Sequence, residues 1–389
     1  MREGWTYKKL GEICEIERGG SPRPIQQYIT DDEDGLNWIK IGDAVEGSKY
    51  INSTKEKIRK EGLKKTRFVH KGDFILSNSM SFGKPYILGI DGCIHDGWLV
   101  IRDTHNHFDK SFLYYLLGSP NMYNEFKRLA VGGVVNNLNS QLVRNVFVPV
   151  PPLSEQQRIV SELDLLSSII DKKKAQLKEY DQLAQSIFYD MFGDPVTNEK
   201  GWEVMRLGDE FEVSSGGTPS TKKSEYWDDG NISWIGSNMC QNQIIFENDG
   251  KYITKEGFEH SSAKLYKKGF VLIALVGATI GKVALLNFAT TTNQNIAGVN
   301  VPSNKDFDPM FVFYLIQSMY CFFENIGDGK FKMANLSFVR SLPIIKPSYE
   351  IQQSFTSKIE VIERQKALVR QSITEAETLF NSRMDYWFS

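Results

Sequence analysis

Two long stretches of this chain carry apolar residues at alternating steps of four and three, which is the heptad pattern of a coiled coil. In the first stretch Lys173 interrupts the pattern, and the apolar positions are Ile159, Leu163, Leu166, Ile170, Leu177, Tyr180, Ala184, Ile187 and Met191. In the second stretch Lys366 interrupts it, and the apolar positions are Phe355, Ile359, Ile362, Val369, Ile373, Ala376 and Phe380. An offset of 196 carries one set onto the other. The pattern therefore predicts two helices in one register, each of roughly 36 residues or about 54 Å.

The first helix is expected to start at about Glu155, since Ser154 and Gln157 form a capping-box pattern. In the second stretch Glu350 replaces the serine, and Ser348 is the predicted cap. A helix with one apolar stripe needs a partner to cover it, so the two helices are expected to pack on each other. The alternative is that each helix packs only on its own globular domain.

The segments between the helices have short runs of β-branched and aromatic residues, which are typical of strands. The runs are Phe74–Leu76, Trp98–Ile101, Val146–Val150, Val271–Leu275 and Ile296–Val301, and helices are expected at Phe112–Leu117 and Met310–Ile316. We therefore predict a mixed α/β fold. Residues 1–150 and 198–345 would be two globular domains, residues 151–197 a helix with a linker, and residues 346–389 the second helix.

The two globular domains are predicted to be copies of one another. The segment GWTYKKLGEICEIERGGSPRP at residues 4–24 returns as GWEVMRLGDEFEVSSGGTPST at residues 201–221, and further matches continue along the chain at offsets of 196 to 199. A repeat with so long an offset is a duplicated domain, because the units of a solenoid recur every 20 to 50 residues or so. Halves related by a pseudo-twofold axis would make the helix pair antiparallel and bring Ser389 near Met1, in a near-circular layout.

Composition and motifs exclude several classes of function. The net charge is −2, and the four cysteines form no CxxC pair, which indicates free thiols in a reducing cytoplasm. With no secretory signal pattern and no apolar run long enough for a bilayer, we expect a cytoplasmic protein without membrane segments. There is no Walker loop, HExxH or GxSxG pattern, and the pairs His105/His107 and Cys93/His95 gather no further ligand. We predict no catalytic and no metal-binding residues.

Local charge is the feature that points to a binding partner. Residues 53–73 have eight Lys or Arg against three acidic residues, a local charge of +5, and residues 251–268 have five lysines against two glutamates, a local charge of +3. A charge run is usually a solvated face, but recurrence in both copies favours contact with phosphate groups. The acidic residues 31–34 and 228–229 are predicted to be solvated turns that face away from any nucleic acid.

Two Gly-rich segments also recur, with residues 18–23 matching 215–220 and residues 132–141 matching 327–337. Glycine permits close backbone approach, and Asn, Gln, Ser and Arg can contact base edges, although turns between strands are an equally good interpretation. Trp38 and Trp234 are expected in the core. The predicted DNA-binding residues of the first copy are Arg18, Gly19, Gly20, Arg23, Lys57, Arg59, Lys60, Lys64, Lys65, Arg67, Lys84, Asn136, Asn137, Asn139 and Gln141. Those of the second copy are Gly216, Gly217, Thr218, Lys222, Lys264, Lys267, Lys268, Lys282, Lys330, Lys332 and Asn335.

These motifs resemble those of the specificity subunit of type I restriction–modification systems. The resemblance rests on the GW…LG…GGSP/GGTP segment of both copies and on VPVPPLSEQQRIVSELD at the start of the first helix. It also rests on MFGDP after that helix and on a degenerate IIKPSYEIQQSF before the second helix. Tyr349, Glu350 and Ile351 stand where Leu-Ser-Glu would be usual, which weakens the match locally.

The resemblance implies a non-catalytic subunit whose two target recognition domains each read one half of a bipartite site in double-stranded DNA. The helices would set the spacer between the half-sites and dock two methyltransferase (modification) subunits. Where the complex also restricts DNA, two restriction/translocase subunits would join. S-adenosylmethionine, ATP and Mg would belong to these partners and not to this chain. The alternatives are a single-chain methyltransferase–nuclease, whose motifs are missing, and a coiled-coil scaffold protein with protein-binding heads.

Overall fold

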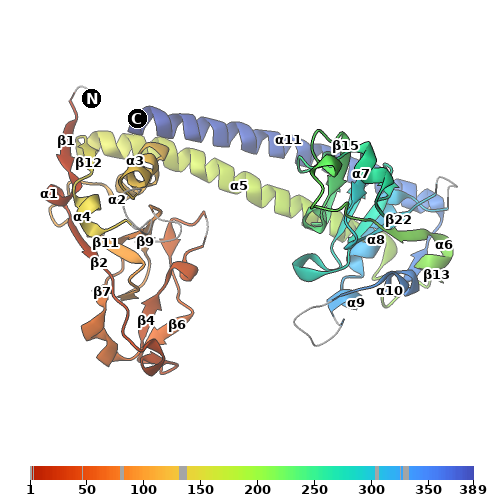
Figure 1. Cartoon of the computed structure of the whole chain (residues 1–389), viewed down its shortest axis with the longest axis horizontal. Coiled ribbons are helices and arrows are strands. Elements are labelled where there is room, and N and C mark those ends of the chain that lie inside the picture. Colours follow the sequence, from red (N-terminus) through yellow and green to blue (C-terminus); the bar gives the residue numbers. More distant parts are fainter. Residues whose placement is uncertain are drawn as a thin grey trace. The chain divides into compact units, whose positions relative to one another are not determined.

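The computed structural model describes residues 2, 4–45, 47–78, 83–130, 138–302, 306–324, 326 and 333–389. The chain divides into a first unit, Met1–Lys174 with Gln371–Ser389, and a second unit, Ala175–Arg370. Each unit holds one sheet-rich globular part and one half of each of two long helices (Figure 1). The helices α5 (Leu153–Phe192) and α11 (Tyr349–Phe388) have 40 residues each.

The globular part of the first unit is built from two five-stranded sheets and a small third one. The first sheet has the order β2 (Glu15–Arg18), β11 (Trp98–Arg102), β8 (Phe74–Ser77), β9 (Pro85–Leu88), β5 (Tyr50–Ile51). The second has the order β3 (Ile29–Thr30), β6 (Glu56–Ile58), β4 (Leu36–Ile39), β10 (Gly92–Ile94), β7 (Arg67–Val69), and β1 (Thr6–Lys9) pairs with β12 (Phe147–Val150). The short helices are α1 (Leu10–Ile13), α2 (Lys110–Gly118), α3 (Pro120–Ala130), α4 (Ser140–Arg144), η1 (Ile25–Gln27), η2 (Ile41–Asp43) and η3 (Lys60–Lys65).

The second unit repeats this topology, which confirms the predicted duplication. Its main sheet has the order β14 (Glu212–Ser215), β22 (Ile296–Asn300), β19 (Val271–Ala274), β20 (Val283–Leu286), β16 (Gln243–Ile245). The other sheets are β17 (Tyr252–Ile253), β15 (Ile232–Ile235), β21 (Thr290–Thr292), β18 (Leu265–Tyr266), and the pair β13 (Glu203–Arg206) with β23 (Pro343–Lys346). The short helices are α6 (Leu207–Glu210), α7 (Lys255–Glu259), α8 (Pro309–Ser318), α9 (Cys321–Glu324), α10 (Leu336–Ser341), η4 (Ser224–Tyr226), η5 (Ser237–Met239) and η6 (Gly277–Thr279).

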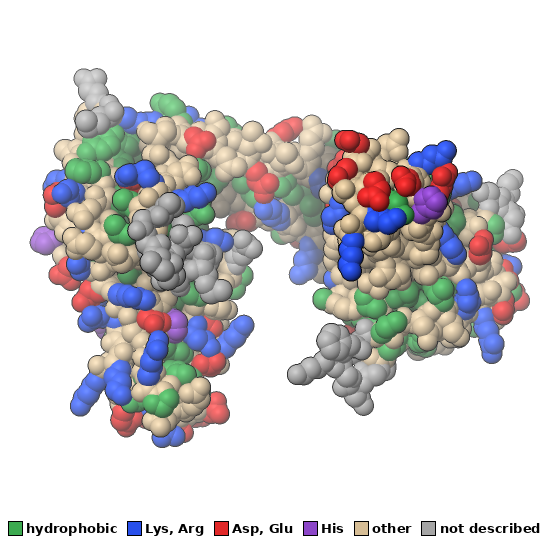
Figure 2. All heavy atoms as spheres, viewed as in Figure 1, with side chains coloured by type: hydrophobic (Ala, Val, Ile, Leu, Met, Phe, Trp, Pro, Cys, Tyr) green, Lys and Arg blue, Asp and Glu red, His purple; other side chains and the backbone are tan. Residues whose placement is uncertain are grey.

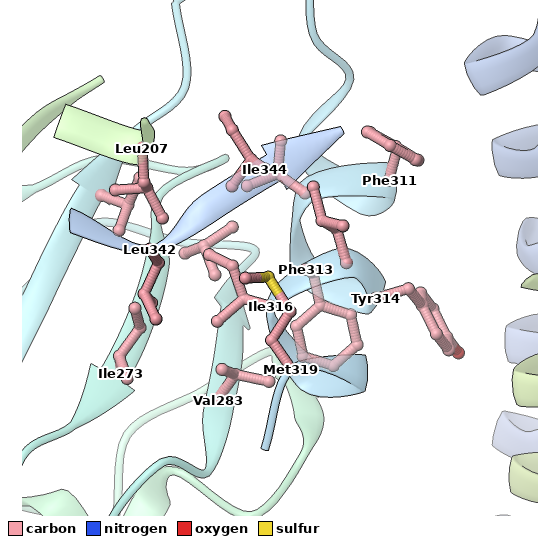
Figure 3. Close-up of a cluster of buried hydrophobic side chains, with 14 of the residues drawn as sticks. Leu207, Ile273, Val283, Phe311, Phe313, Tyr314, Ile316, Met319, Leu342 and Ile344 are labelled. Carbon is pink, nitrogen blue, oxygen red and sulfur yellow. The ribbon is translucent and has the colours of Figure 1, made fainter. Parts of the chain in front are cut away.

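The predicted strands correspond to β8, β11, β12, β19 and β22, and the two predicted short helices to α2 and α8, so these predictions are confirmed. Trp38 and Trp234 are buried, as expected. In the second unit α8 lies between the main sheet and the long helices. Figure 3 shows Phe313 and Ile316 of this helix on the side of Ile273 (β19), Val283 (β20) and Ile344 (β23) in one apolar cluster. The long helices take part in this core, because Phe355 and Ile359 of α11 belong to the same cluster.

The predicted start of the first helix was wrong by two residues. The helix begins at Leu153, and Ser154 lies inside its first turn and not at the cap. The carbonyl of Pro152 accepts hydrogen bonds from the backbone of Glu155 and Gln156 at 2.9 and 3.0 Å, so the helical bonds begin at the proline. In the second copy Ser348 directly precedes the helix, as predicted.

One glutamine in the first turn of each long helix, Gln156 in the first copy and Gln352 in the second, has a structural role. Gln156 is buried and accepts from the backbone N–H of Asp109 at 2.7 Å while donating to the carbonyl of Pro151 at 2.9 Å. Gln352 does the same with Asp308 N–H and Pro347 at 2.9 and 2.9 Å. A buried amide with its hydrogen bonds satisfied ties the start of each long helix to the short helix beside it.

Within each unit the two long helices pack on each other in antiparallel fashion. In the first unit Glu162 of α5 pairs with Arg383 of α11, and Lys174 lies 2.7 Å from Glu377. In the second unit the Lys366 ammonium lies 2.7 Å from Asp181. Each long helix packs both on the other helix and on a globular part, so the two alternatives given above combine. The buried seam residues that also belong to a globular core are Ile159 and Leu163 in the first unit and Phe355 and Ile359 in the second. Ile170, Ile362, Val369 and Ile373 are buried and Leu166 and Leu177 half-buried.

The two chain ends meet in the first unit. The Arg2 guanidinium lies over the rings of Tyr386 and Trp387, with 4.4 and 4.7 Å to their centroids. Asn121 donates to the carbonyl of Phe388 at 2.9 Å. This contact agrees with the expected closeness of the termini, although Met1 itself lies outside the described residues. Within the part of the chain that the structure describes, no helix combines the length and the apolar character needed to cross a bilayer.

Candidate nucleic-acid interface

In the first unit, loops that are far apart in sequence meet at one end of the main sheet. The Gly-rich loop after β2 bonds to the last residue of β10 and the first residue of β11, with Gly19 N–H donating to the Trp98 carbonyl at 2.9 Å. Gly20 N–H donates to the Ile94 carbonyl at 3.2 Å. Leu138, the first described residue of the second Gly-rich segment, donates its N–H to the carbonyl of Asn78 at 2.9 Å. We call residues 18–24, 78, 95–97 and 138 the first loop cluster.

The recurring glycines are explained by chain packing. A Cβ on Gly19 would lie 2.3 Å from the His95 carbonyl oxygen, and one on Gly20 would lie 2.7 Å from the Lys65 carbonyl oxygen. These distances are too short for any side chain. The close approach at Gly20 sets the loop directly against η3, which carries much of the basic window.

The same packing occurs in the second unit, where we call residues 215–220, 275, 293–295 and 334 the second loop cluster. A Cβ on Gly216 would lie 2.3 Å from the Thr292 carbonyl oxygen, and one on Gly217 would lie 2.6 Å from the Ala263 nitrogen. Both glycines are buried. Contact of Gly216 and Gly217 with DNA stays a prediction, and the partly exposed Thr218 is the most accessible residue of the three.

The basic window of the first unit is only partly available for phosphate. Lys60 lies 2.7 Å from Asp34, and the Lys57 ammonium donates to the Glu33 carbonyl at 3.0 Å. The ion pair lowers the pKa of Asp34 and raises the pKa of Lys60, through the hydrogen bond between them. The acidic turn therefore lies beside the basic window, and its expected orientation away from nucleic acid stays a prediction. Figure 2 shows acidic side chains mixed among the Lys and Arg of this unit.

Two other cations of the window keep their charge exposed, and two more have a partner. Lys64 and Arg59 are exposed, and their side chains have no partner among the described residues. Lys65 is held by Tyr28, with 2.8 Å from its ammonium to the phenol oxygen. Arg67 lies 3.3 Å from Glu17.

In the second unit the cations are fewer but sit at the matching place. Lys264 directly follows Ala263, against which Gly217 packs, and its side chain has no partner within the described residues. Lys223 lies over the ring of Tyr226 with 2.9 Å to the phenol oxygen. Tyr226 corresponds to Tyr28, so a lysine is held on a tyrosine in both units. The exposed Lys222 and Lys267 complete this surface.

Several predicted residues are elsewhere or have another role. Asn139 and Asn335 cap α4 and α10 by accepting from Leu142 and Phe338 N–H groups. Lys84 and Lys268 line clefts beside the long helices. The Lys282 ammonium donates to Gln241 at 2.8 Å. Gln141 is exposed on α4. Asn136, Asn137, Lys330 and Lys332 lie outside the described residues.

The described part of the chain contains no group of three or more His, Cys, Asp and Glu placed to hold a metal ion. Burial raises the pKa of the Cys14 and Cys93 thiols to about 12, which keeps them protonated at neutral pH. His107 hydrogen-bonds Asp103 at 3.0 Å, as a structural surface histidine would.

The prediction from sequence missed the residues at the tip of each cluster. These are His95 and Asp96 in the first unit and Asn293 and Gln294 in the second. Each pair directly follows a short strand that lies beside a buried tryptophan strand, β10 beside β4 and β21 beside β15. Aligning the copies at an offset of 198 would have placed them opposite each other, and their different chemistry was the available signal.

Comparison with known proteins gives a consistent result. The model of the type I restriction modification DNA specificity domain matches this chain twice, over residues 2–179 and 199–378. The chain is 23% identical to the type I restriction enzyme MjaIX specificity subunit of Methanocaldococcus jannaschii, over 94% of this chain and 89% of that protein. It is 26% identical to the putative MjaX specificity subunit of the same organism, over 93% and 87%.

Solved structures share the fold. A chain from a study of complex assembly and conformational transition of the type I R-M system matches with a TM-score of 0.60 and 19% identity, covering 100% of this chain and 98% of that one. The S subunit of a type I system from M. genitalium matches with a TM-score of 0.52 and 13% identity, covering 98% and 95%.

Proposed function

This chain belongs to the type I restriction modification DNA specificity family, and from its two loop clusters we propose that each unit reads one half of a bipartite DNA site. Its role is that of the specificity subunit, a non-catalytic component for DNA recognition. The scaffold alternative has no support among the comparisons. The observation that carries the proposal is the repeated surface in which a Gly-rich loop, a strand-connecting turn and unpaired lysines lie together in each unit.

The chemistry of this surface suits DNA. Exposed Lys64 and Arg59 in the first unit, and Lys264 and Lys267 in the second, can bind phosphates without regard to sequence. The loop tips beside them carry Arg, Asp, Asn and Gln, which are side chains that discriminate base edges. Phosphate contacts would set the position and the tips would supply the sequence preference.

Methylation mapping tests this proposal. We expect the chain, expressed with its modification subunit, to direct methylation to one bipartite motif. Substitutions in the first loop cluster should alter only one half of the motif, and substitutions in the second loop cluster only the other half. Methylation at a continuous, undivided motif, or alteration of both halves by one cluster, would contradict it.

We also propose that the outer face of the helix pair binds the modification subunits. With Leu163 as heptad position a, Phe188 and Met384 occupy e positions and are buried in the globular cores. Lys174 and Glu377, also at e, meet across the pair, so the e sides of both helices face one way. In an antiparallel pair the g sides then meet on the opposite face.

That opposite face exposes apolar side chains in equal number in both units. Six apolar residues at positions c and g are between 47% and 62% exposed: Leu165, Leu379 and Tyr386 in the first unit, and Leu183, Val361 and Leu368 in the second. Leu165 corresponds to Val361 and Leu183 to Leu379, at an offset of 196. Repeated exposed apolar residues mark an interaction site, and two equivalent sites suit two copies of one subunit.

Paired substitutions test the docking sites one at a time. We expect L165S/L379S to leave one modification subunit bound and L183S/V361S to do the same, as measured by native mass spectrometry of the purified complex. K172S, at an exposed c position of α5, is the control and should retain both subunits. Two bound subunits in both double variants would exclude these faces.

We propose that the cofactors of the reaction belong to the partners. S-adenosylmethionine would be bound by the modification subunits, and ATP with Mg by the restriction/translocase subunits where they are present. A methyl-transfer assay with this chain alone, expected to give no product, tests the first assignment.

A further inference from the structure

The turn after β10 in the first unit and the turn after β21 in the second have the same backbone frame. In the first unit His95 N–H donates to the Ile39 carbonyl at 3.0 Å, and Gly97 N–H donates to His95 Nδ1 at 3.0 Å. Ser21 of the Gly-rich loop donates its hydroxyl to Asp96 Oδ1 at 2.9 Å. The turn and the Gly-rich loop are thus fixed to each other by a side-chain bond.

The second unit repeats each of these bonds. Asn293 N–H donates to the Ile235 carbonyl at 3.2 Å, and Asn295 N–H donates to Asn293 Oδ1 at 3.0 Å. Thr218 donates its hydroxyl to Gln294 Oε1 at 2.6 Å. Asp96 and Gln294 are therefore structural equivalents, each held by the hydroxyl of the Gly-rich loop.

The two units differ in the exposed side chain that the turn and the Gly-rich loop hold in place. In the first unit the Arg23 guanidinium is 3.8 Å from Asp96 Oδ2, and its side chain is 83% exposed. A fixed carboxylate beside a long exposed arginine limits the directions that the guanidinium can take. Asp96 is thereby a positioning residue, and the five donors of Arg23 remain mostly available.

In the second unit Ser220 takes the place of Arg23, and the exposed Gln294 is itself the functional group. Its Oε1 accepts one bond from Thr218 and has a second lone pair. Its Nε2 has no partner among the described residues. The amide thus presents one acceptor and two donors in a fixed orientation.

Both tips lie beside the unpaired cations of their unit. Gly20, next to Ser21, packs on the backbone of Lys65 and so lies beside Lys64, and Gly217, next to Thr218, packs on Ala263 and so lies beside Lys264. A duplex bound to those lysines through its phosphates would bring base edges to the tip.

Resting on the proposed function, we propose that Arg23 reads a guanine in one half-site and Gln294 reads an adenine in the other. Arginine matches the O6 and N7 acceptors of guanine with two parallel hydrogen bonds, and glutamine matches the N6 donor and N7 acceptor of adenine. The two units would then use one frame with exchanged side chains to recognise different bases.

The test uses the complex of this chain with its modification subunit and a set of duplexes based on the mapped site, each with one position varied. Wild type should prefer guanine at one position of the first half-site and adenine at one position of the second, each by about 10-fold or more. R23A should lose the guanine preference and retain the adenine preference. Q294E should exchange adenine for cytosine, because a carboxylate only accepts hydrogen bonds and cytosine offers its N4 donor.

A gain of function separates base reading from damage to the fold. S220R/Q294D copies the first tip into the second unit and should make the second half-site prefer guanine at the former adenine position. If R23A and Q294E both leave every base preference unchanged while the bipartite site is still bound, this inference is wrong and the proposed function stands. If wild type recognises no bipartite site, the proposed function itself fails.

Discussion

At the scale of single residues, cations of one short helix differ in the charge they have left for DNA. Lys64 and Lys60 both lie in η3, but Lys60 is paired with Asp34 at 2.7 Å and Lys64 has no partner among the described residues. We expect K64A to weaken binding to cognate and unrelated DNA alike and to lower the salt slope by about 0.9, since one phosphate contact is lost.

K60A is the matched control and should change the slope by less, because its charge is already offset by a carboxylate. Titration of the dissociation constant against salt concentration measures both variants. A selective loss for cognate DNA in K64A would place this lysine at a base edge, and an equal effect of both variants would show that the ion pair does not matter.

The same residues show how far the sequence leads at this scale. Charge counts located the basic window correctly, but they could not reveal that Lys60 meets an aspartate 26 residues earlier in the chain. The recurring glycines were noticed as possible contacts, while the structure gives them a steric reason, since Gly19 and Gly216 pass within 2.3 Å of a carbonyl oxygen at the Cβ position. Sequence patterns located these residues, but their contacts could be identified only from the folded structure.

At the scale of helices, one carboxylate joins α5 to α11 in the first unit. Glu162 accepts from the Arg383 guanidinium and from Trp387 Nε1 at 3.1 Å. The Arg383 hydrogen bond, with that of Trp387, lowers the pKa of Glu162 although partial burial opposes it. We expect E162Q to destabilise the protein by about 1–2 kcal/mol at neutral pH.

The pH dependence follows from the lowered pKa. Because the folded state holds the carboxylate ionised, its stabilisation is complete above the unfolded value of about 4.3 and is lost as pH falls through the lower folded value. The difference in melting temperature between wild type and E162Q should therefore shrink below about pH 4. E155Q, which loses only an exposed pair with Arg158, is the control and should change stability little. A constant difference across this range would show that Glu162 acts by packing.

In the second unit a buried lysine interrupts the seam between the helices. Lys366 is 5% exposed and pairs with Glu363 at 2.6 Å and Asp181 at 2.7 Å. The first unit has Ile170 and Ser167 at the positions of Lys366 and Glu363. We expect K366I alone to cost about 1–3 kcal/mol, because Glu363 is left without its partner in a mostly buried place.

Copying both residues of the other half should restore stability. K366I/E363S removes the uncompensated carboxylate together with the lysine, and buried ion pairs replaced by apolar groups are often neutral. Denaturant unfolding measures the three proteins. If the double variant is as unstable as K366I, the lysine has a role that its apolar equivalent cannot supply.

The helices were the elements that the sequence predicted best, because a heptad repeat depends only on spacing. The start of α5 was misplaced because a capping-box pattern was favoured over Pro152, whose carbonyl begins the helical hydrogen bonds. The order of the strands in the sheets was beyond the pattern, since β2 pairs with β11 across about 80 residues of chain. Duplication was nevertheless a strong guide, for the main sheet and the terminal strand pair of one unit have their equivalents in the other, although β3 has no counterpart strand.

At the scale of the whole molecule, duplication separates two tasks that a symmetric dimer would have to combine. The long helices retain equivalent apolar faces, with Leu165 and Leu183 matched by Val361 and Leu379, so that one kind of partner can bind twice. The loop tips diverge, with Asp96 in one unit and Gln294 in the other. Equivalent helices and different tips are what recognition of an asymmetric site by a complex with identical partner subunits requires.

The helices are also proposed to set the spacing between the half-sites, and paired insertions test this. Seven residues inserted after Gln176 and after Ser372, positions that are 196 apart, preserve the heptad register of both helices. They add about 10 Å to each helix, which corresponds to roughly three base pairs of duplex at about 3.4 Å per pair. We expect methylation mapping to show a spacer longer by up to about three base pairs with both half-site sequences unchanged. Insertion in only one helix misaligns the seam and should abolish methylation. Altered half-sites at constant spacing would show that the helices do not set the distance.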